Sequence, residues 1–418
     1  MGEVLFLAHR IPFPPDRGDK IRSHHLLKAI AALAPVHVAT LADDPADMAE
    51  EPAVMAEEAE LGLLAASYRL LRRSKPLVLA GVEAVLSGQP VSLTAFHHPA
   101  LESYVREVLA SRPISAIFVF SGQMPHYVPD DFAGRVVMDF VDVDSAKFQA
   151  YAKAARWPAS RVHAREERLL RAEEARACRR ADVSLLISEA ERALFQQRLP
   201  PDLRATARLE VLPNGIDAEA FDPAQVAPDP RMAAFDSPRL IFTGQMDYAP
   251  NVAAAVRAID RIMPLVREVL PTATFHVVGR NPAGELLARE GLNGARIWGR
   301  VDDIRTWLAA ADLALVPLDI ARGVQNKVLE AMAMGLPVVL TSGAATGIPA
   351  TDGQHFCVRD TDMALAHAAI DLLRDGPRAR AKGQAARRFV MERASWPAAL
   401  AGLPALLGLS RAGVSHAA

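Results

Sequence analysis

A lysine and a glutamate three positions apart carry the clearest chemical signal in this sequence. Lys327 and Glu330 lie in the segment NKVLEAMAMGLPVVLTS at 326–342, and Asn326 stands four positions before the glutamate. The segment predicts a helix that ends near Gly335 and is followed by a buried strand. Residues three and four apart share one face of a helix, so these three side chains are expected to project together from its first turns.

This combination of groups suits an anionic phosphate ligand. The first turn of a helix presents free amide N–H groups and the positive end of the helix dipole. Lys327 adds a mobile positive charge, and Glu330 can accept a hydrogen bond from a sugar or ribose hydroxyl. The alternative is a surface Lys–Glu pair, which would contribute only about 0.5 kcal/mol to stability.

Short apolar runs alternate with stretches of helical periodicity, which is typical of parallel sheets built from strand–helix–strand units. The sequence therefore predicts an α/β protein with two doubly wound domains. Ligands of such sheets bind beyond the carboxyl ends of the strands, here at a cleft between the domains. The expected strands are 4–8, 36–41, 116–120, 135–139, 183–187 and 209–212 in the first half, and 239–243, 274–278, 295–298, 313–316, 338–341 and 355–358 in the second.

Prolines and aspartates interrupt the pattern between the two halves, where no regular element is expected. We expect an N-terminal domain at 1–217, a linker at 218–238 and a C-terminal domain at 239–383. An amphipathic segment at 384–409 has no strand after it and is expected to pack back toward the N-terminal domain. The tail at 410–418 is expected to be loose.

The composition excludes several classes of protein. Among 418 residues, 47 Lys and Arg against 49 Asp and Glu give a net charge of -2, which argues against a nucleic-acid binder. Cys178 and Cys357 are the two cysteines, so neither a disulfide framework nor a thiolate zinc site is indicated. Since no run of about 18 apolar residues and no secretory signal is recognised, a cytoplasmic protein is expected.

The segment at 326–342 resembles the donor-site signature of the family 4 glycosyltransferases, which have the GT-B fold. Other segments resemble the same family in the same order: VLPNGIDAEAF at 211–221, IFTGQMDYAPN at 241–251, HVVGRNP at 276–282 and GRVDDIRTWLAAADLALVPL at 299–318. In the N-terminal half, HRIPFPPDRGDKIRSHHLL at 9–27 and MDFVDVDSAKFQAYA at 138–152 resemble a narrower group. That group is the bacterial sugar transferases of exosortase (PEP-CTERM) exopolysaccharide systems, and the similarity covers nearly the whole chain.

The resemblance implies two Rossmann-like domains facing a central cleft, with a nucleotide diphosphate sugar bound to the second domain as donor substrate. It implies that Glu330 holds the ribose, that the base rests against Arg300 and Val301, and that neither a metal nor another cofactor is needed. Preorganised positive groups at the departing diphosphate would lower the barrier. The further donor contacts that the resemblance implies are Gly244, Gln245, Gly279, Asn326 and Lys327.

The sequence departs from the family pattern at the donor site. The wider family has two glutamates eight positions apart; Glu330 matches the second, and Arg322 occupies the place of the first. The usual donor-loop arginine is replaced by Gln245, and the usual lysine falls at Pro250 or Asn251. We expect Arg322 to take part of the cationic role at the diphosphate, together with Lys327.

Two loops of the first domain contain further candidate residues. Asp142 follows a strand and is expected to face the acceptor as a general base; a metal-binding carboxylate pair and a helix cap formed by Asp144 or Ser145 are the alternatives. In the loop RIPFPPDRGDK, Arg17, Gly18 and Lys20 are candidate contacts for the donor phosphate or the acceptor, and a purely structural turn is the alternative.

Basic residues gather at 69–75 and at 156–180. A solvated helix face explains them, and attraction to the anionic inner face of the plasma membrane is the alternative. The latter would suit a lipid-linked saccharide acceptor and a peripheral location at that membrane.

The leading hypothesis is a metal-independent, retaining glycosyltransferase. It would move a sugar from a nucleotide diphosphate sugar to a lipid-linked saccharide in exopolysaccharide biosynthesis. A catalytically silent GT-B scaffold or binding subunit and a nucleotide-sugar epimerase remain as alternatives.

Overall fold

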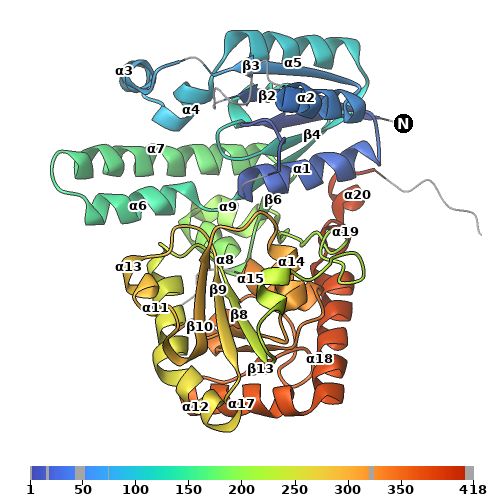
Figure 1. Ribbon diagram of the computed structural model, residues 1–418. Coiled ribbons are helices and arrows are strands. Elements are labelled where there is room, and N and C mark those ends of the chain that lie inside the picture. The colour runs from blue at the N-terminus through green and yellow to red at the C-terminus, as the bar shows by residue number, and fades with distance from the viewer. Residues whose placement is uncertain (1, 16–17, 43–51, 74, 320–323, 410–418) are drawn as a thin grey trace, which may run out of the picture. The chain divides into compact units, whose positions relative to one another are not determined.

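The computed structural model describes residues 2–15, 18–42, 52–73, 75–319 and 324–409 (Figure 1). These residues form two compact units. The first unit comprises the described residues up to Asn214 together with residues 400–409, and the second unit comprises Gly215–Ala399.

The first unit is built on a parallel sheet of seven strands in the order β3-β2-β1-β4-β5-β6-β7. Its central strands are apolar and buried on both faces, as expected when helices cover both sides of a parallel sheet. The strands are β1 (Glu3–Ala8), β2 (Val36–Ala42), β3 (Ser67–Arg72), β4 (Ile114–Phe120), β5 (Arg135–Val141), β6 (Val183–Leu186) and β7 (Leu209–Val211).

Helices connect these strands and include a long hairpin formed by α6 and α7. The helices of the first unit are α1 (Gly18–Ala31), α2 (Pro52–Leu64), α3 (Leu77–Ser87), α4 (Val91–Phe96), α5 (Pro99–Ser111), α6 (Asp144–Ala154), α7 (Ala159–Arg180), α8 (Glu189–Arg198), α9 (Pro201–Thr206) and α20 (Leu403–Leu406), with a 3-10 turn at Pro125–Tyr127.

The second unit has a parallel sheet of six strands in the order β10-β9-β8-β11-β12-β13. The strands are β8 (Arg239–Thr243), β9 (Thr274–Val278), β10 (Ala295–Gly299), β11 (Leu313–Val316), β12 (Val338–Leu340) and β13 (Cys357–Val358). A single core of buried apolar residues fills the space between this sheet and its helices. The prediction of two parallel-sheet domains is therefore confirmed.

The helices of the second unit follow the strands in the expected alternation. They are α10 (Pro230–Ala233), α11 (Ala249–Arg257), α12 (Met263–Val269), α13 (Gly284–Leu287), α14 (Ile304–Ala310), α15 (Asn326–Ala333), α16 (Ser342–Ala345), α17 (Asp362–Arg374), α18 (Gly376–Phe389) and α19 (Trp396–Ala399). Two π-helical turns, Ala258–Ile262 and Val390–Ala394, and a 3-10 turn at Leu292–Gly294 complete the set.

The expected strands are all present, with ends that differ by at most two residues, and β3 is a further strand that the sequence pattern did not predict. That strand lies at the edge of the first sheet, and its residues SYRLLR are half-buried or exposed. Its arginines instead indicate a basic surface cluster when the sequence is considered alone. An edge strand is paired on one side only, so it tolerates charged residues that a central strand excludes.

The structure divides the chain differently from the expected boundaries. Segment 218–238, expected as a linker, belongs to the second unit, where Met232 of α10 is fully buried in the core. The amphipathic segment expected at 384–409 is also divided, because α18 already begins at Gly376 and residues up to Ala399 belong to the second unit. Only residues 400–409 join the first unit.

None of the helices formed by the described residues is both long enough and apolar enough to cross a membrane.

Candidate functional site

The candidate site lies at the carboxyl edge of the second sheet. The strands β10, β9, β8 and β11 are neighbours and run parallel, so the loops that follow them emerge at the same edge. Those loops contain Arg300 after β10, Gly279 after β9 and Gly244 after β8, and the loop after β11 leads to α15. The fold therefore collects the expected donor-site segments at one edge.

Two glycines allow the loops after β8 and β9 to approach each other closely. A Cβ atom on Gly279 would lie 1.6 Å from the carbonyl oxygen of Gly244, so any side chain at Gly279 would clash with that loop. Gly244 has a φ of 152°, which L-residues rarely adopt. Gly279 N–H also donates to Gly299 O at 2.9 Å, which fastens the loops after β9 and β10 together.

Helix α15 presents its N-terminus at this edge. The helix buries one apolar face, formed by Val328, Leu329, Ala331, Met332 and Ala333, against the core. No side chain caps its N-terminus, and the first-turn amides of a helix have no acceptor within the helix. A partial positive charge therefore remains available at the start of α15.

Lys327 is held in a mostly apolar position beside Gly244. Its Nζ donates to Asn251 Oδ1 at 2.6 Å and lies 4.6 Å from the centre of the Phe242 ring. A Cβ atom on Gly244 would lie 2.9 Å from this Nζ. Burial lowers the pKa of the Lys327 ammonium to about 8, although Glu330 acts in the opposite direction. The lysine thus supplies a positive charge that is only partly neutralised by the protein.

Glu330 is a half-buried carboxylate to which no described residue donates a hydrogen bond. Burial raises its pKa, and Lys327 lowers it. Lys327 donates to Asn251 instead and forms no direct ion pair with Glu330. These two side chains therefore do not make the surface pair that was the alternative interpretation, and both remain open to a ligand.

The structure places the remaining predicted donor residues at the same edge without joining them into one network. Asn326 and Arg300 are exposed, whereas Val301 packs partly against the core. Gln245 is exposed and accepts a hydrogen bond from Arg280 Nη2 at 3.1 Å. Within the described ranges, no hydrogen bond or ion pair links Arg300 to Lys327 or Glu330.

Three residues shape this site although the sequence did not assign them to it; Asn251 was named only as a possible place of the family's lysine. Asn251 is buried and joins Lys327 to the carbonyl of Gln245, to which its Nδ2 donates at 2.9 Å. Phe242 provides the ring beneath the ammonium, and Arg280 brings a guanidinium to the loop after β8. A cation directly after a glycine at a strand end was the available signal for Arg280. Phe242 looked like any core residue of a strand.

The first unit contains the other candidate residues. Asp142, at the end of β5, forms an ion pair with Lys147 Nζ at 3.0 Å, and Lys147 also pairs with Asp144 at 3.1 Å. Helix α6 begins at Asp144 and has no side-chain cap, so neither Asp144 nor Ser145 caps it. Gly18 is the first residue of α1 and is exposed, whereas Lys20 is buried and donates to Phe13 O at 3.1 Å. Arg17 and Arg322 lie outside the described residues.

A buried ion pair in the first unit was also missed. Arg22 of α1 donates to both carboxylate oxygens of Asp139 at the end of β5, at 2.9 and 3.2 Å, and to Asn214 Oδ1 at 2.8 Å. Burial raises the pKa of Asp139, and the arginine counteracts it. The Arg22 guanidinium therefore joins α1 to β5 and to Asn214, which is the last residue of the first unit's main segment.

In the described part of the chain, no group of three or more His, Cys, Asp or Glu is arranged to hold a metal ion.

The sequence of the second unit matches a known protein family. Residues 237–375 match the family described as "Glycosyl transferases group 1", and this range contains Gly244, Gly279, Arg300, Lys327 and Glu330. The second unit thus carries a glycosyltransferase group 1 domain.

Two curated proteins of Mycolicibacterium smegmatis are similar over about half of the chain. The GDP-mannose-dependent alpha-(1-6)-phosphatidylinositol monomannoside mannosyltransferase is 30% identical over 242 residues, which are 52% of this chain and 59% of that protein. Alpha-maltose-1-phosphate synthase is 32% identical over 211 residues, which are 45% of this chain and 54% of that protein. The chain spans less than two thirds of the length of either relative.

Solved structures extend the likeness to nearly the whole chain. The Anabaena protein HepE, solved in complex with UDP, has a TM-score of 0.58 at 15% identity, over 97% of this chain and 99% of that chain. The expected GT-B fold class, with two Rossmann-like parallel-sheet domains, is confirmed by this likeness.

Proposed function

We propose that this protein is a glycosyltransferase that moves a sugar from a nucleoside diphosphate sugar to a saccharide acceptor. One observation carries the proposal: Lys327 and Glu330 lie unpaired with each other at the N-terminus of α15, in a domain that matches the glycosyltransferases of group 1. The acceptor is a lipid-linked saccharide of exopolysaccharide biosynthesis, and transfer retains the anomeric configuration.

The chemistry follows from charge development at the leaving group. When the sugar departs, negative charge grows on the diphosphate while the sugar becomes cation-like. Lys327 and the free amides of α15 would stabilise that negative charge, and Glu330 would accept a hydrogen bond from a ribose hydroxyl. Removing one such stabilising group typically lowers turnover about 100-fold to 1000-fold. In this scheme protein groups neutralise the diphosphate and no metal ion takes part.

The activities and ligands of similar proteins support this assignment. The mannosyltransferase uses GDP-mannose and acts on a phosphatidylinositol monomannoside, a lipid-linked acceptor. HepE has been solved with UDP, with UDP and glucose, and with UDP-glucose. They favour a nucleotide sugar as donor and leave the base and the sugar to be identified by experiment.

Calorimetry with UDP and GDP tests the assigned site. We expect at least one of them to bind the wild-type protein, and we expect Lys327→Ala and Glu330→Gln to weaken that binding about tenfold or more. Glu268→Gln is the matched control, because Glu268 is an exposed glutamate on α12 of the same unit. Wild-type-like binding in both site variants would contradict the assignment. Absence of binding by either nucleotide would favour the silent scaffold.

Transfer is tested with labelled nucleotide sugars and a lipid extract that contains saccharide acceptors. We expect label in the lipid fraction, unchanged by EDTA. A changed sugar formed without acceptor would instead indicate an epimerase. Loss of transfer on chelation, restored by Mg²⁺, would contradict the metal-independent scheme.

A further inference from the structure

Helix α3 of the first unit exposes its large apolar side chains instead of burying them. Val78, Leu79, Val82, Val85 and Leu86 are 77%, 59%, 54%, 68% and 83% exposed. Their positions follow the period of one helical face, the pattern by which a helix normally packs on a core. Contiguous exposed apolar patches of this kind mark interaction sites.

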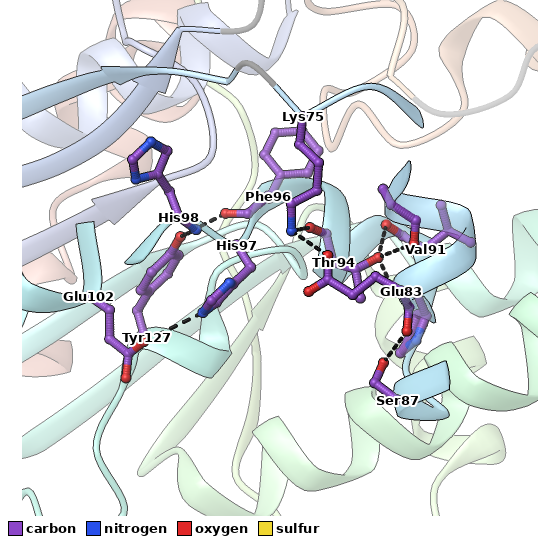
Figure 2. A network of polar contacts seen from close by, with 12 residues as sticks. Lys75, Glu83, Ser87, Val91, Thr94, Phe96, His97, His98, Glu102 and Tyr127 are labelled. Carbon is purple, nitrogen blue, oxygen red and sulfur yellow. Dashed lines mark hydrogen bonds and ion pairs between the residues drawn. The ribbon is translucent and has the colours of Figure 1, made fainter. Parts of the chain in front are cut away.

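The opposite face of α3 holds the helix on the protein, and Figure 2 shows the polar contacts of Lys75, Glu83 and Thr94 that contribute to this attachment. Ala80 and Ala84 are fully buried, and Thr94 Oγ1 of α4 donates to Ala80 O at 2.9 Å. Lys75 Nζ bridges Glu83 Oε2, at 2.5 Å, and Thr94 O, at 2.9 Å. Small and polar groups therefore fix the helix, so its apolar face has no role within the described first unit.

The turn between α6 and α7 combines aromatic and basic residues. Trp157 is 78% exposed, and Tyr151 and Val162 are also exposed. Segment 145–165 contains five Lys or Arg residues and no Asp or Glu. Of these, Lys153, Arg156 and Arg161 are exposed and take part in none of the ion pairs formed by the described residues. A positive charge excess therefore surrounds the exposed tryptophan.

Hydrogen bonds connect this turn to α3. Arg165 Nη2, one helical turn after Arg161, donates to Ala84 O of α3 at 2.6 Å and to Gln89 O at 3.3 Å. Glu166 accepts from the backbone N–H groups of Val91 and Ser92 at the start of α4, at 3.0 and 3.2 Å. Figure 1 shows α3 and the α6–α7 turn on the same side of the first unit. We call the exposed residues of these two elements the docking surface.

We propose that the docking surface binds the headgroup and upper acyl region of a lipid bilayer that contains anionic lipids. The apolar face of α3 and Trp157 enter the bilayer surface, and Arg156 and Arg161 contact the phosphates. An exposed tryptophan among cations suits a membrane interface, where its ring is half-apolar and the lipid headgroups are anionic. A protein partner would need acidic groups to complement the same cations. The inference deepens the proposed lipid-linked acceptor by naming the membrane-facing surface.

The charged residues at 156–180 show how far the positive charge of the docking surface extends. Near the end of α7, two arginines form ion pairs, Arg176 with Glu173 and Arg179 with Asp202. Arg168 and Arg171 of α7 are exposed and form no ion pair among the described residues, so the positive charge of the turn continues along the first half of α7.

Vesicle co-sedimentation of the full-length protein tests the proposal without any transfer reaction. We expect binding to vesicles of phosphatidylcholine with phosphatidylglycerol, and much weaker binding to phosphatidylcholine alone. Each surface cation contributes about fivefold to such binding, so Arg156→Gln with Arg161→Gln should weaken it roughly 25-fold. Val82→Ser with Leu86→Ser removes apolar contact and should weaken it roughly tenfold or more.

Matched controls come from the second unit. Leu287→Ser and Arg378→Gln change exposed residues of the same types and should leave vesicle binding unchanged. Tryptophan fluorescence gives a local readout, because Trp307 and Trp396 are buried and Trp298 stacks on His276. A blue shift on vesicle addition should therefore disappear in Trp157→Phe.

Several outcomes would overturn the proposal. They are absence of vesicle binding, binding that ignores anionic lipid, and binding that the α3 and arginine variants leave intact. A concentration-dependent dimer that the α3 variant abolishes would assign the surface to a second copy of the chain instead. Because donor binding is measured separately, loss of vesicle binding leaves the proposed donor site untouched.

Discussion

At the scale of single residues, the site depends on keeping one ammonium poorly solvated and unpaired with the carboxylate beside it. Phe242 covers one side of Lys327, and Asn251 supplies a neutral acceptor. An ion pair with Glu330 would have cancelled the charge that a diphosphate needs. A neutral amide orients the lysine without neutralising it, so the positive charge stays available.

The pKa of Lys327 predicts how donor binding depends on pH. Burial lowers this pKa to about 8, so the side chain is mostly charged at about pH 7 and mostly neutral at about pH 9. We expect the affinity for the bound nucleoside diphosphate to fall roughly tenfold over that range, as measured by calorimetry. In Lys327→Arg the guanidinium stays charged, so this slope should flatten. An equal slope in both proteins would show that another group causes it.

At the scale of elements, the sequence predicts most of what positions the site. Apolar runs such as RLIFT and TFHVV are buried on both faces, so their hydrophobicity alone locates β8 and β9. The sequence likewise predicts α15 from Gly335 and Pro337, which follow the helix and end it. Parallel pairing then places the loops at one edge.

Long-range packing sets what the sequence does not predict. The contact of Asn251 with Lys327 joins residues 76 positions apart, and neither residue alone indicates the other. The packing of segment 218–238 on the second unit depends on a buried methionine among prolines, which local rules assign to a loop.

The contact between α6 and α7 predicts that the stability of this helix pair depends on pH. Glu174 of α7 accepts from Ser145 N at 2.8 Å and from Ser145 Oγ at 2.6 Å, and burial raises its pKa to about 7. The folded state therefore binds this proton more tightly than the unfolded state does. The resulting stability is present below about pH 4.5 and is lost as pH rises through 7.

We therefore expect the free energy of unfolding of the first unit to fall by up to roughly 3 kcal/mol between about pH 5 and pH 8 through this group. Glu174→Gln cannot ionise and keeps an amide oxygen for Ser145 N, so it should remove this part of the slope and stabilise the protein at the higher pH. Urea unfolding at about pH 5 and about pH 8 measures this change in the free energy of unfolding. Glu173→Gln, the adjacent position, is the control, and an unchanged slope in Glu174→Gln would refute the assignment.

At the scale of the whole molecule, the chain forms the first unit in two separate pieces. After the second unit is complete at Ala399, residues 400–409 return to the first unit. There Arg135 Nε of β5 donates to Leu406 O at 2.6 Å, and Leu403 is fully buried. The first unit therefore remains incomplete until the chain's last described residues are in place, whereas the second unit is a continuous segment.

This path predicts that a substitution near the C-terminus destabilises the fold of the N-terminal half. Leu403→Ala leaves a cavity and should lower the stability of the first unit by about 2 to 5 kcal/mol. Hydrogen exchange measured on peptides should accelerate in β4 and β5, because local opening reports local stability. Peptides of β8 and β9 should exchange as in the wild type. Met363→Ala, an exposed apolar position of the second unit, is the control. Faster exchange in β8 and β9 alone would place residues 400–409 with the second unit instead.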